Sequence, residues 1–460
     1  MKRRVLFLLL MVFWAARVLG NSTPVRWEDS PISVLMSVDP NTTIAVTEEV
    51  LTFDFTEEEQ TDFSYKGRVE ASYTMINTGS EKVNSSMAFP IIGSIAESLQ
   101  DDVQLTADGK EVDHATVYGD RVDDLDEVFA DLSVETILGQ LDGNDYKPEN
   151  FDMESAMTCY TFNVETPLEA MDLEVSWQDN GNQSHFSQGF NGYQIREDGG
   201  RTASSWIRND GIGLKIYSLQ NDLNFTYSGE VLEEGNERQA TDAFTVSLEK
   251  EELPMDAFIV EFMTASSYGG LPKQTVLDHL DFYIKELDRS LDHSPAVITE
   301  SDVEHILSTE RYIIFVYDVP FQANEIQNST ITYSTSGIMD RSRTVTPTYT
   351  YQYLLKPAEH WKSFQNLTIR VLPPKEAPYM IDSSMSFERS EDGNYIAAAQ
   401  ELPTENLQFT LFEKEQIGTS DRIKGYINNH LYGLLIFGVP LAGLLVLGIL
   451  ARMLIKIWKK

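Results

Sequence analysis

Two apolar segments, one near each end, set the first limits on the fold of this 460-residue chain. Residues 431–451 carry no charged side chain, and as a helix of about 32 Å they match the roughly 30 Å hydrocarbon core of a bilayer. Basic residues follow, so residues 452–460 are predicted to be a cytoplasmic tail. Residues 1–20 have the basic start, short apolar stretch and small-residue end of a signal peptide. The chain is therefore predicted to be a single-pass protein of the plasma membrane, with its N-terminal ectodomain outside.

The predicted ectodomain is strongly acidic. The chain has 72 Asp and Glu residues against 35 Lys and Arg, and its formal net charge is −37 at pH 7. A surface of this sign repels the phosphates of nucleic acid, which excludes nucleic acid as a partner. Contact with membrane lipid is expected through the one transmembrane helix. The carboxylates are also hard oxygen ligands of the kind that calcium prefers.

One acidic cluster begins like a calcium-binding loop. Its candidate metal ligands are Asp142, Asn144, Asp145, Glu149 and Asp152. Tyr146 and Lys147 break the register of an EF-hand loop, in which ligands recur at alternate positions. Two interpretations stay open: a calcium cofactor at this cluster, or a solvated acidic surface without any cofactor.

Cys159 is the only cysteine, so the chain cannot form an intramolecular disulfide. Extracellular domains of eukaryotes are usually cross-linked by disulfides, although a core of this size does not need them. The single cysteine therefore favours a bacterial envelope with one membrane. Cys159 lies in a strand-like pattern and is predicted to be a buried residue rather than a nucleophile.

Residues 21–119 show the period-two alternation of β-strands. Apolar residues recur at every second position from 69 to 75, a turn follows, and a second alternating run stops at Pro90. Another hairpin is predicted at Asp108-Gly109, a two-residue turn signal. This segment is therefore predicted to be an antiparallel β-sandwich domain.

The pattern changes after this segment. Residues 120–265 are predicted to hold a helical insert and further strands that pack with the first domain. Residues 266–308 are predicted to be a helical bridge, because an apolar stripe follows Pro272, which suits a first helical turn, and Pro295 prevents continuation. The stripe consists of Val276, Leu277, Leu280, Ile284, Leu287 and Leu291.

Residues 309–418 contain further strand patterns and are predicted to form a second antiparallel β-sandwich domain. Residues 312–317 form an unbroken apolar run, typical of a strand buried on both faces. Residues 419–430 are predicted to be a polar juxtamembrane tether. The predicted fold class is mainly β: two antiparallel β-sandwich-like domains with helical inserts, plus one C-terminal transmembrane helix.

An aromatic stripe is the candidate ligand-binding site. Tyr349, Tyr351 and Tyr353 share one face of a predicted strand, and Trp361 follows nearby in the sequence. If exposed, these rings would form a stacking platform for a sugar. If buried, they would be core residues, because aromatic residues are common in strands. Both interpretations stay open on sequence grounds.

Short motifs relate the chain to two groups of proteins. Phe89-Pro90, followed by Asp108-Gly109-Lys110, resembles the opening of vault/inter-alpha-trypsin (VIT) domains. Through residues 189–193 and 351–361, the whole chain resembles membrane-anchored surface proteins of Gram-positive anaerobes. The second resemblance implies a location at the cell surface, and neither resemblance implies an activity.

No HExxH, GxSxG, Walker A or Rossmann motif occurs in the sequence, and no catalytic residue is nominated. Ser247 and Lys250 have SxxK spacing but lie in a strand pattern. Asp278, His279 and Asp281 could be metal ligands but are more typical of a solvated helix face. We therefore expect a non-enzymatic binding or scaffold protein of the bacterial cell envelope, with an envelope protein or a wall glycan as partner. The alternatives are a carboxylate-based hydrolase acting on an envelope polymer and a calcium-stiffened spacer.

Overall fold

The computed structural model describes most of the predicted ectodomain. The described residues are 26–27, 32–60, 64–99, 103–141, 146–178, 185–208, 213–232, 238–265, 270–293 and 297–433. The predicted signal peptide, nearly all of the predicted transmembrane helix and the predicted tail lie outside these residues. Within the described ranges, no helix is both long enough and apolar enough to cross a membrane.

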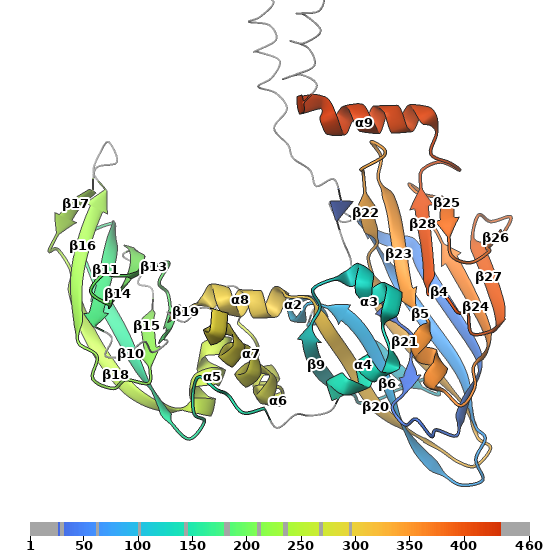
Figure 1. Ribbon diagram of the computed structural model, residues 1–460, viewed down its shortest axis with the longest axis horizontal. Coiled ribbons are helices and arrows are strands. Elements are labelled where there is room, and N and C mark those ends of the chain that lie inside the picture. The colour runs from blue at the N-terminus through green and yellow to red at the C-terminus, as the bar shows by residue number, and fades with distance from the viewer. Residues whose placement is uncertain are drawn as a thin grey trace, which may run out of the picture.

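Two sheets pack face to face in the larger of two β-sandwiches (Figure 1). The ten-stranded sheet consists of β1 (Arg26–Trp27), β2 (Ile32–Ser33), β3 (Met36–Ser37), β6 (Val83–Gly93), β9 (Ala115–Arg121), β20 (Arg311–Phe321), β22 (Ile338–Asp340), β23 (Thr348–Leu354), β25 (Tyr379–Ser383) and β28 (Leu407–Phe412). The eight-stranded sheet consists of β4 (Ile44–Gln60), β5 (Tyr65–Asn77), β7 (Gln104–Ala107), β8 (Lys110–Glu111), β21 (Ile326–Thr335), β24 (Gln365–Leu372), β26 (Glu388–Arg389) and β27 (Tyr395–Glu401). The alternating apolar residues from 69 to 75 lie in the core between the sheets.

This sandwich corrects the predicted division into β domains at 21–119 and 309–418. β6 pairs with β20 along its whole length, β5 pairs with β21, and β4 runs parallel to β24. Strands of both segments therefore share both sheets and one core. Period-two alternation shows which side of a strand is buried, but it does not show which strand lies beside it.

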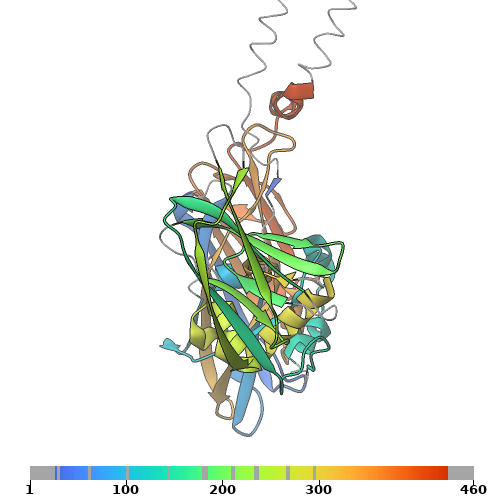
Figure 2. The same ribbon diagram turned by 90° about the vertical axis from the view of Figure 1, so that its left-hand side faces the viewer.

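The middle of the chain forms a smaller sandwich, which faces the viewer in Figure 2. One sheet consists of β10 (Ala156–Glu165), β12 (His185–Gln188), β15 (Leu214–Ser218), β18 (Thr245–Pro254) and β19 (Val297–Ile298). The other consists of β11 (Ala170–Gln178), β13 (Gly192–Ile195), β14 (Gly200–Arg208), β16 (Phe225–Leu232) and β17 (Arg238–Thr241). Phe162 and Trp177 belong to a core separate from that of the larger sandwich, so the strands predicted within 120–265 do not share the core of the first domain. Cys159 on β10 is buried, as predicted.

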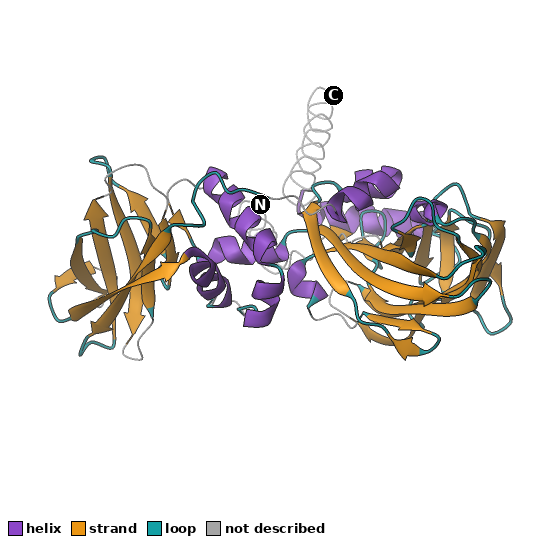
Figure 3. Cartoon of the chain, turned by 90° about the horizontal axis from the view of Figure 1, so that it is seen from below, coloured by secondary structure: helices purple, strands orange, loops and turns teal. Residues whose placement is uncertain are grey.

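Helices lie between the two sandwiches (Figure 3). They include α2 (Ile95–Ser98), α5 (Met255–Thr264), α6 (Lys273–Asp278), α7 (Leu280–His293) and α8 (Glu300–Ser308). The predicted helical bridge is thus present, but the chain bends at His279 between α6 and α7. Because this bend shifts the helical phase, Leu287 and Leu291 are buried as predicted whereas Leu277 is exposed.

Two more helices cover the outer face of the ten-stranded sheet. They are α3 (Leu125–Asp131) and α4 (Val134–Leu141). Leu132 and Ile137 pack there with Ile314 of β20, whereas Phe315 of the same strand lies in the main core. β20 is therefore buried on both faces, as its unbroken apolar run predicts.

The fold class is mainly β with helical inserts, as predicted. The sheets are mixed rather than purely antiparallel, because β2 runs parallel to β23 and β12 runs parallel to β19. Further helical elements are η1 (Lys356–His360) and α9 (Thr419–Gly433). α9 occupies the segment predicted to be a polar juxtamembrane tether.

Candidate functional site

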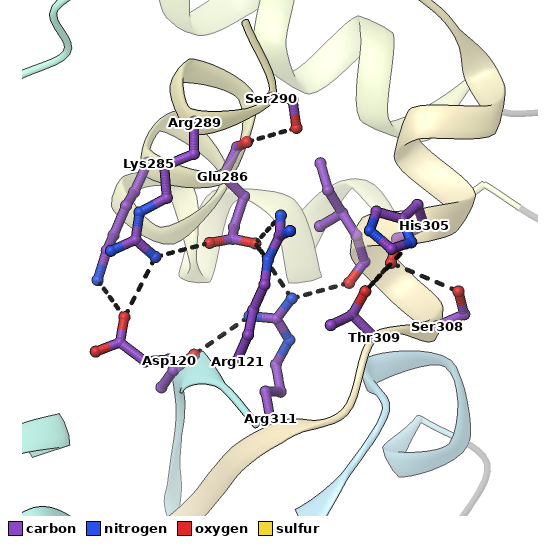
Figure 4. A network of polar contacts seen from close by, with 12 residues as sticks. Asp120, Arg121, Lys285, Glu286, Arg289, Ser290, His305, Ser308, Thr309 and Arg311 are labelled. Atoms are coloured by element: carbon purple, nitrogen blue, oxygen red, sulfur yellow. Dashed lines mark hydrogen bonds and ion pairs between the residues drawn. The ribbon is translucent and has the colours of Figure 1, made fainter. Parts of the chain in front are cut away.

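A buried arginine joins the larger sandwich to the helices beside it (Figure 4). Arg311 is the first residue of β20 and is 0% exposed. Its guanidinium donates hydrogen bonds to the carbonyl oxygen of Gly119 on β9 at 3.2 Å and to that of Ile306 on α8 at 3.0 Å. It also donates to Oε2 of Glu286 on α7 at 3.3 Å. One side chain thus connects two strands of the sheet to two helices.

Glu286 is the centre of this network, and it is 1% exposed. Arg121 on β9 donates to its Oε2 from Nε at 3.0 Å and from a terminal nitrogen at 2.9 Å. Arg289 donates to its Oε1 at 3.3 Å. Three guanidinium groups therefore contact one carboxylate. Arg121 and Arg289 are partly exposed, whereas Arg311 is fully buried and depends on Glu286 for a contacting negative charge.

Asp120 extends the network towards the surface. Its Oδ1 accepts hydrogen bonds from Nζ of Lys285 at 2.9 Å and from Arg289 at 3.3 Å. Partial burial acts to raise the pKa of Asp120, but the hydrogen bonds and charges of Lys285 and Arg289 outweigh it, so the pKa lies below its usual value. The network then contains four cationic and two anionic side chains.

A cavity of about 380 Å³ adjoins the network between β9, α4 and the junction of α6 with α7. Asp120 and Lys285 belong to both the network and the cavity wall. The other lining residues are Thr116, Val117, Tyr118, Gly119, Gly139, Gln140, Tyr146, Leu277, Asp278, His279, Leu280, Asp281 and Phe282. The volume of this cavity lies in the range of small-ligand sites, and its wall combines aromatic rings with charged side chains.

Aromatic rings form part of the cavity wall. The ring centroid of Tyr118 lies 4.4 Å from that of His279 and 5.4 Å from that of Phe282. Neither ring nitrogen of His279 has a hydrogen-bond partner among the described residues. Burial lowers the pKa of His279, while the charge of Asp278 acts in the opposite direction. The imidazole is therefore neutral at neutral pH and offers a ligand one donor and one acceptor.

Asp288 of α7, which is buried, holds another part of the cavity wall. Its Oδ2 accepts hydrogen bonds from the Tyr146 hydroxyl at 2.6 Å and from the Glu149 N–H at 2.8 Å, and its Oδ1 accepts from the Asn150 N–H at 2.9 Å. Burial and the hydrogen bond to Asp288 raise the pKa of Tyr146 to about 12. The phenol thus keeps its proton and remains a donor to Asp288.

The predicted calcium cluster is described in part. Three of its five candidate ligands lie outside the described residues: Asp142, Asn144 and Asp145. Glu149 contacts Asp288 through its backbone, and Oδ1 of Asp152 accepts a hydrogen bond from the Glu154 N–H. Among the residues that the structure describes, no group of three or more His, Cys, Asp or Glu could hold a metal ion. Calcium binding at this cluster stays a prediction.

The aromatic stripe lies in the core of the larger sandwich. Tyr349, Tyr351, Tyr353 and Trp361 are all buried. Tyr351 stacks on Phe409 with ring centroids 5.2 Å apart, and Nε1 of Trp361 donates to the Leu35 carbonyl oxygen at 2.9 Å. The stripe is buried because β23 turns this face towards the opposite sheet. These residues are therefore core residues and do not form a sugar-stacking platform.

A buried carboxyl group lies in the same core, and no motif in the sequence predicts it. Glu49 on β4 is 0% exposed and pairs with Tyr73 on β5. The Tyr353 hydroxyl, from the opposite sheet, donates to Oε1 of Glu49 at 3.5 Å and lies 3.4 Å from the Tyr73 hydroxyl. Oε2 of Glu49 has no hydrogen-bond partner among the described residues. Burial raises the pKa of Glu49 to about 8, although both tyrosine hydroxyls lower it.

The charged network was also missed, although two signals for it exist in the sequence. Glu286 directly precedes Leu287 and follows Tyr283 by three positions, which places a charge on the buried side of an amphipathic helix. Arg311 directly precedes the apolar run at 312–317. Each signal identifies an unusual charge, but neither shows that the two side chains meet.

Comparisons with known proteins give no family for this chain. No model of a protein family matches it, and no curated protein matches it. One similar solved structure is that of a Legionella pneumophila protein provisionally described as nutrient-binding. The similarity covers 83% of this chain and 70% of that chain, at 10% sequence identity and a TM-score of 0.33. At that score the likeness supports no conclusion about fold or function.

Proposed function

We propose that this chain is a surface-displayed binding protein of a bacterial envelope, anchored by residues 431–451, and that the cavity beside β9 and α7 holds one sugar unit of a wall glycan. The cavity is the observation that carries the proposal. Tyr118 and Phe282 line the cavity and are only partly buried, so the exposed parts of their rings can contact the apolar surface of a sugar, and polar groups such as His279 suit its hydroxyls. The charged residues of the wall are Asp120, Asp278 and Asp281 against Lys285, so the cavity itself suits an uncharged sugar unit.

The alternative of a carboxylate-based hydrolase has less support. Such an enzyme needs a carboxyl group of raised pKa at the site where the polymer binds. In the described part of the chain, the carboxyl group with a raised pKa is that of Glu49, which is sealed in the core of the larger sandwich. At the cavity, the pKa of Asp120 is lowered instead. Binding without hydrolysis therefore fits the cavity better.

Replacing His279 with alanine should weaken glycan binding, because it removes a ring and two polar nitrogens from the cavity wall. Calorimetric titration of the full chain in nanodiscs with the peptidoglycan disaccharide measures the effect. We expect saturable binding by the wild type and a roughly tenfold weaker Kd for His279→Ala, equivalent to about 1.4 kcal/mol. His114→Ala, an exposed histidine outside the cavity lining, is the matched control and should bind like the wild type. Absence of saturable binding by the wild type, or equal Kd values for both variants, contradicts the proposal.

A further inference from the structure

α9 packs on the larger sandwich through polar and small residues. Asp421, Gly425 and Asn429 recur every four residues and so share one face of the helix. Nδ2 of Asn429 donates to the carbonyl oxygens of Arg341 at 2.8 Å and Ser342 at 3.1 Å. Gly425 is buried against the backbone of the same loop, where a Cβ atom would come within 2.6 Å of it. The helix is therefore fixed to the protein by its polar face.

The opposite face of α9 is apolar and exposed. Ile423, Tyr426 and Ile427 are 55%, 59% and 46% exposed. At 100° per residue, these three positions are centred almost directly opposite Gly425. A surface helix of a globular protein normally has the reverse arrangement, with its apolar stripe against the core. The inversion indicates that something apolar covers this face in the cell.

The surrounding sequence indicates what covers it. Arg422 and Lys424 flank the apolar face and are exposed, so α9 is locally basic in a chain of net charge −37. The chain then continues from Gly433 to residue 451 without any charged side chain. If residues 431–451 span the membrane, as predicted, α9 lies at the level of the lipid headgroups. Basic residues beside an apolar stripe are the composition of helices that lie in that layer.

We propose that α9 lies flat in the outer headgroup layer of the membrane, with Ile423, Tyr426 and Ile427 towards the acyl chains and Arg422 and Lys424 at the phosphates of anionic lipids. The inference rests on the proposed membrane anchor but not on glycan binding. Figures 1 and 2 show that α9 runs along the long axis of the protein. A flat α9 would therefore hold both sandwiches alongside the membrane, with the smaller one beside the larger one and not above it.

Spin labelling of the full chain in vesicles of phosphatidylcholine and phosphatidylglycerol tests this placement. Cys159→Ser removes the one native thiol, and Ile427→Cys carries the nitroxide label. The control label is at Ile326→Cys on β21, an isoleucine that is 62% exposed and lies outside α9. We expect the ratio of oxygen to nickel-chelate collision rates to be several-fold higher at residue 427 than at residue 326, because oxygen enters lipid and the chelate does not.

Three results would overturn the inference, and each identifies a different error. Equal ratios at residues 427 and 326 would place α9 in water. Protection of residue 427 from both oxygen and the chelate would show that protein, either a partner or a second copy of the chain, covers this face. Failure of the chain to float with the vesicles would remove the membrane anchor itself. Glycan binding is measured separately, so its failure would leave the placement of α9 unaffected.

Discussion

Replacing Glu286 with glutamine is expected to lower the free energy of unfolding of the full chain by about 3–5 kcal/mol. Glutamine keeps the shape of the side chain but removes its charge. Arg311 is then fully buried with no negative charge in contact among the residues that the structure describes. A loss of this size corresponds to a melting temperature lower by roughly 10 °C. Thermal unfolding of the chain in nanodiscs, followed by circular dichroism, measures the shift.

Two further variants separate the buried charge from a general loss of charge. Glu304→Gln removes the same charge from an exposed position on α8, so it should change stability by less than about 0.5 kcal/mol. Arg311→Met, added to Glu286→Gln, removes the isolated cation and should restore much of the loss. Arg121 and Arg289 can still turn to water, because their side chains are 29% and 39% exposed. Equal melting temperatures for Glu286→Gln and Glu304→Gln would show that the network does not stabilise the junction.

Local features of the fold were predictable from the sequence, and long-range pairing was not. The alternation from Val69 to Met75 correctly predicted a strand and the side of that strand that is buried. Such alternation is a local property, because successive side chains of a strand point to opposite faces. The apolar run at 312–317 correctly predicted a strand that is buried on both faces. The pairing of β6 with β20 joins residues more than 200 positions apart, from Gly93–Arg311 to Val83–Phe321. No pattern within either strand specifies that partner.

The same limit explains the outcome for the candidate sites. The tyrosine stripe on β23 is recognisable from its spacing in the sequence. Whether the stripe is buried depends on whether another sheet covers it, so the sequence alone does not distinguish core residues from a sugar-stacking platform. The cavity is built from β9, α4 and the bend at His279, which are brought together by the tertiary fold. Asp278, His279 and Asp281 were noticed in the sequence, yet their position at a cavity depends on that bend, which no proline or glycine marks.

Replacing Glu49 with glutamine is expected to stabilise the protein at pH 8 and to leave its stability at pH 4 nearly unchanged. Folding raises the pKa of this carboxyl group from 4.5 to about 8. Below pH 4.5 both the folded and the unfolded chain hold the proton. Between pH 4.5 and 8 the unfolded chain releases it while the folded chain keeps it, so the free energy of unfolding falls by about 1.4 kcal/mol per pH unit. Glutamine does not titrate, so the Glu49→Gln variant lacks this loss.

The difference in stability between Glu49→Gln and the wild type should therefore grow with pH and reach about 4 kcal/mol at pH 8. Thermal unfolding at a series of pH values measures it, and comparison of variants cancels the titration of the other acidic residues. Glu48→Gln is the matched control, because Glu48 is the neighbouring residue on β4 and points to solvent. Its profile should run parallel to that of the wild type. If the Glu49→Gln profile also runs parallel, Glu49 is ionised in the folded protein. A buried negative charge beside Tyr73 and Tyr353 would then require a cation or water in that core.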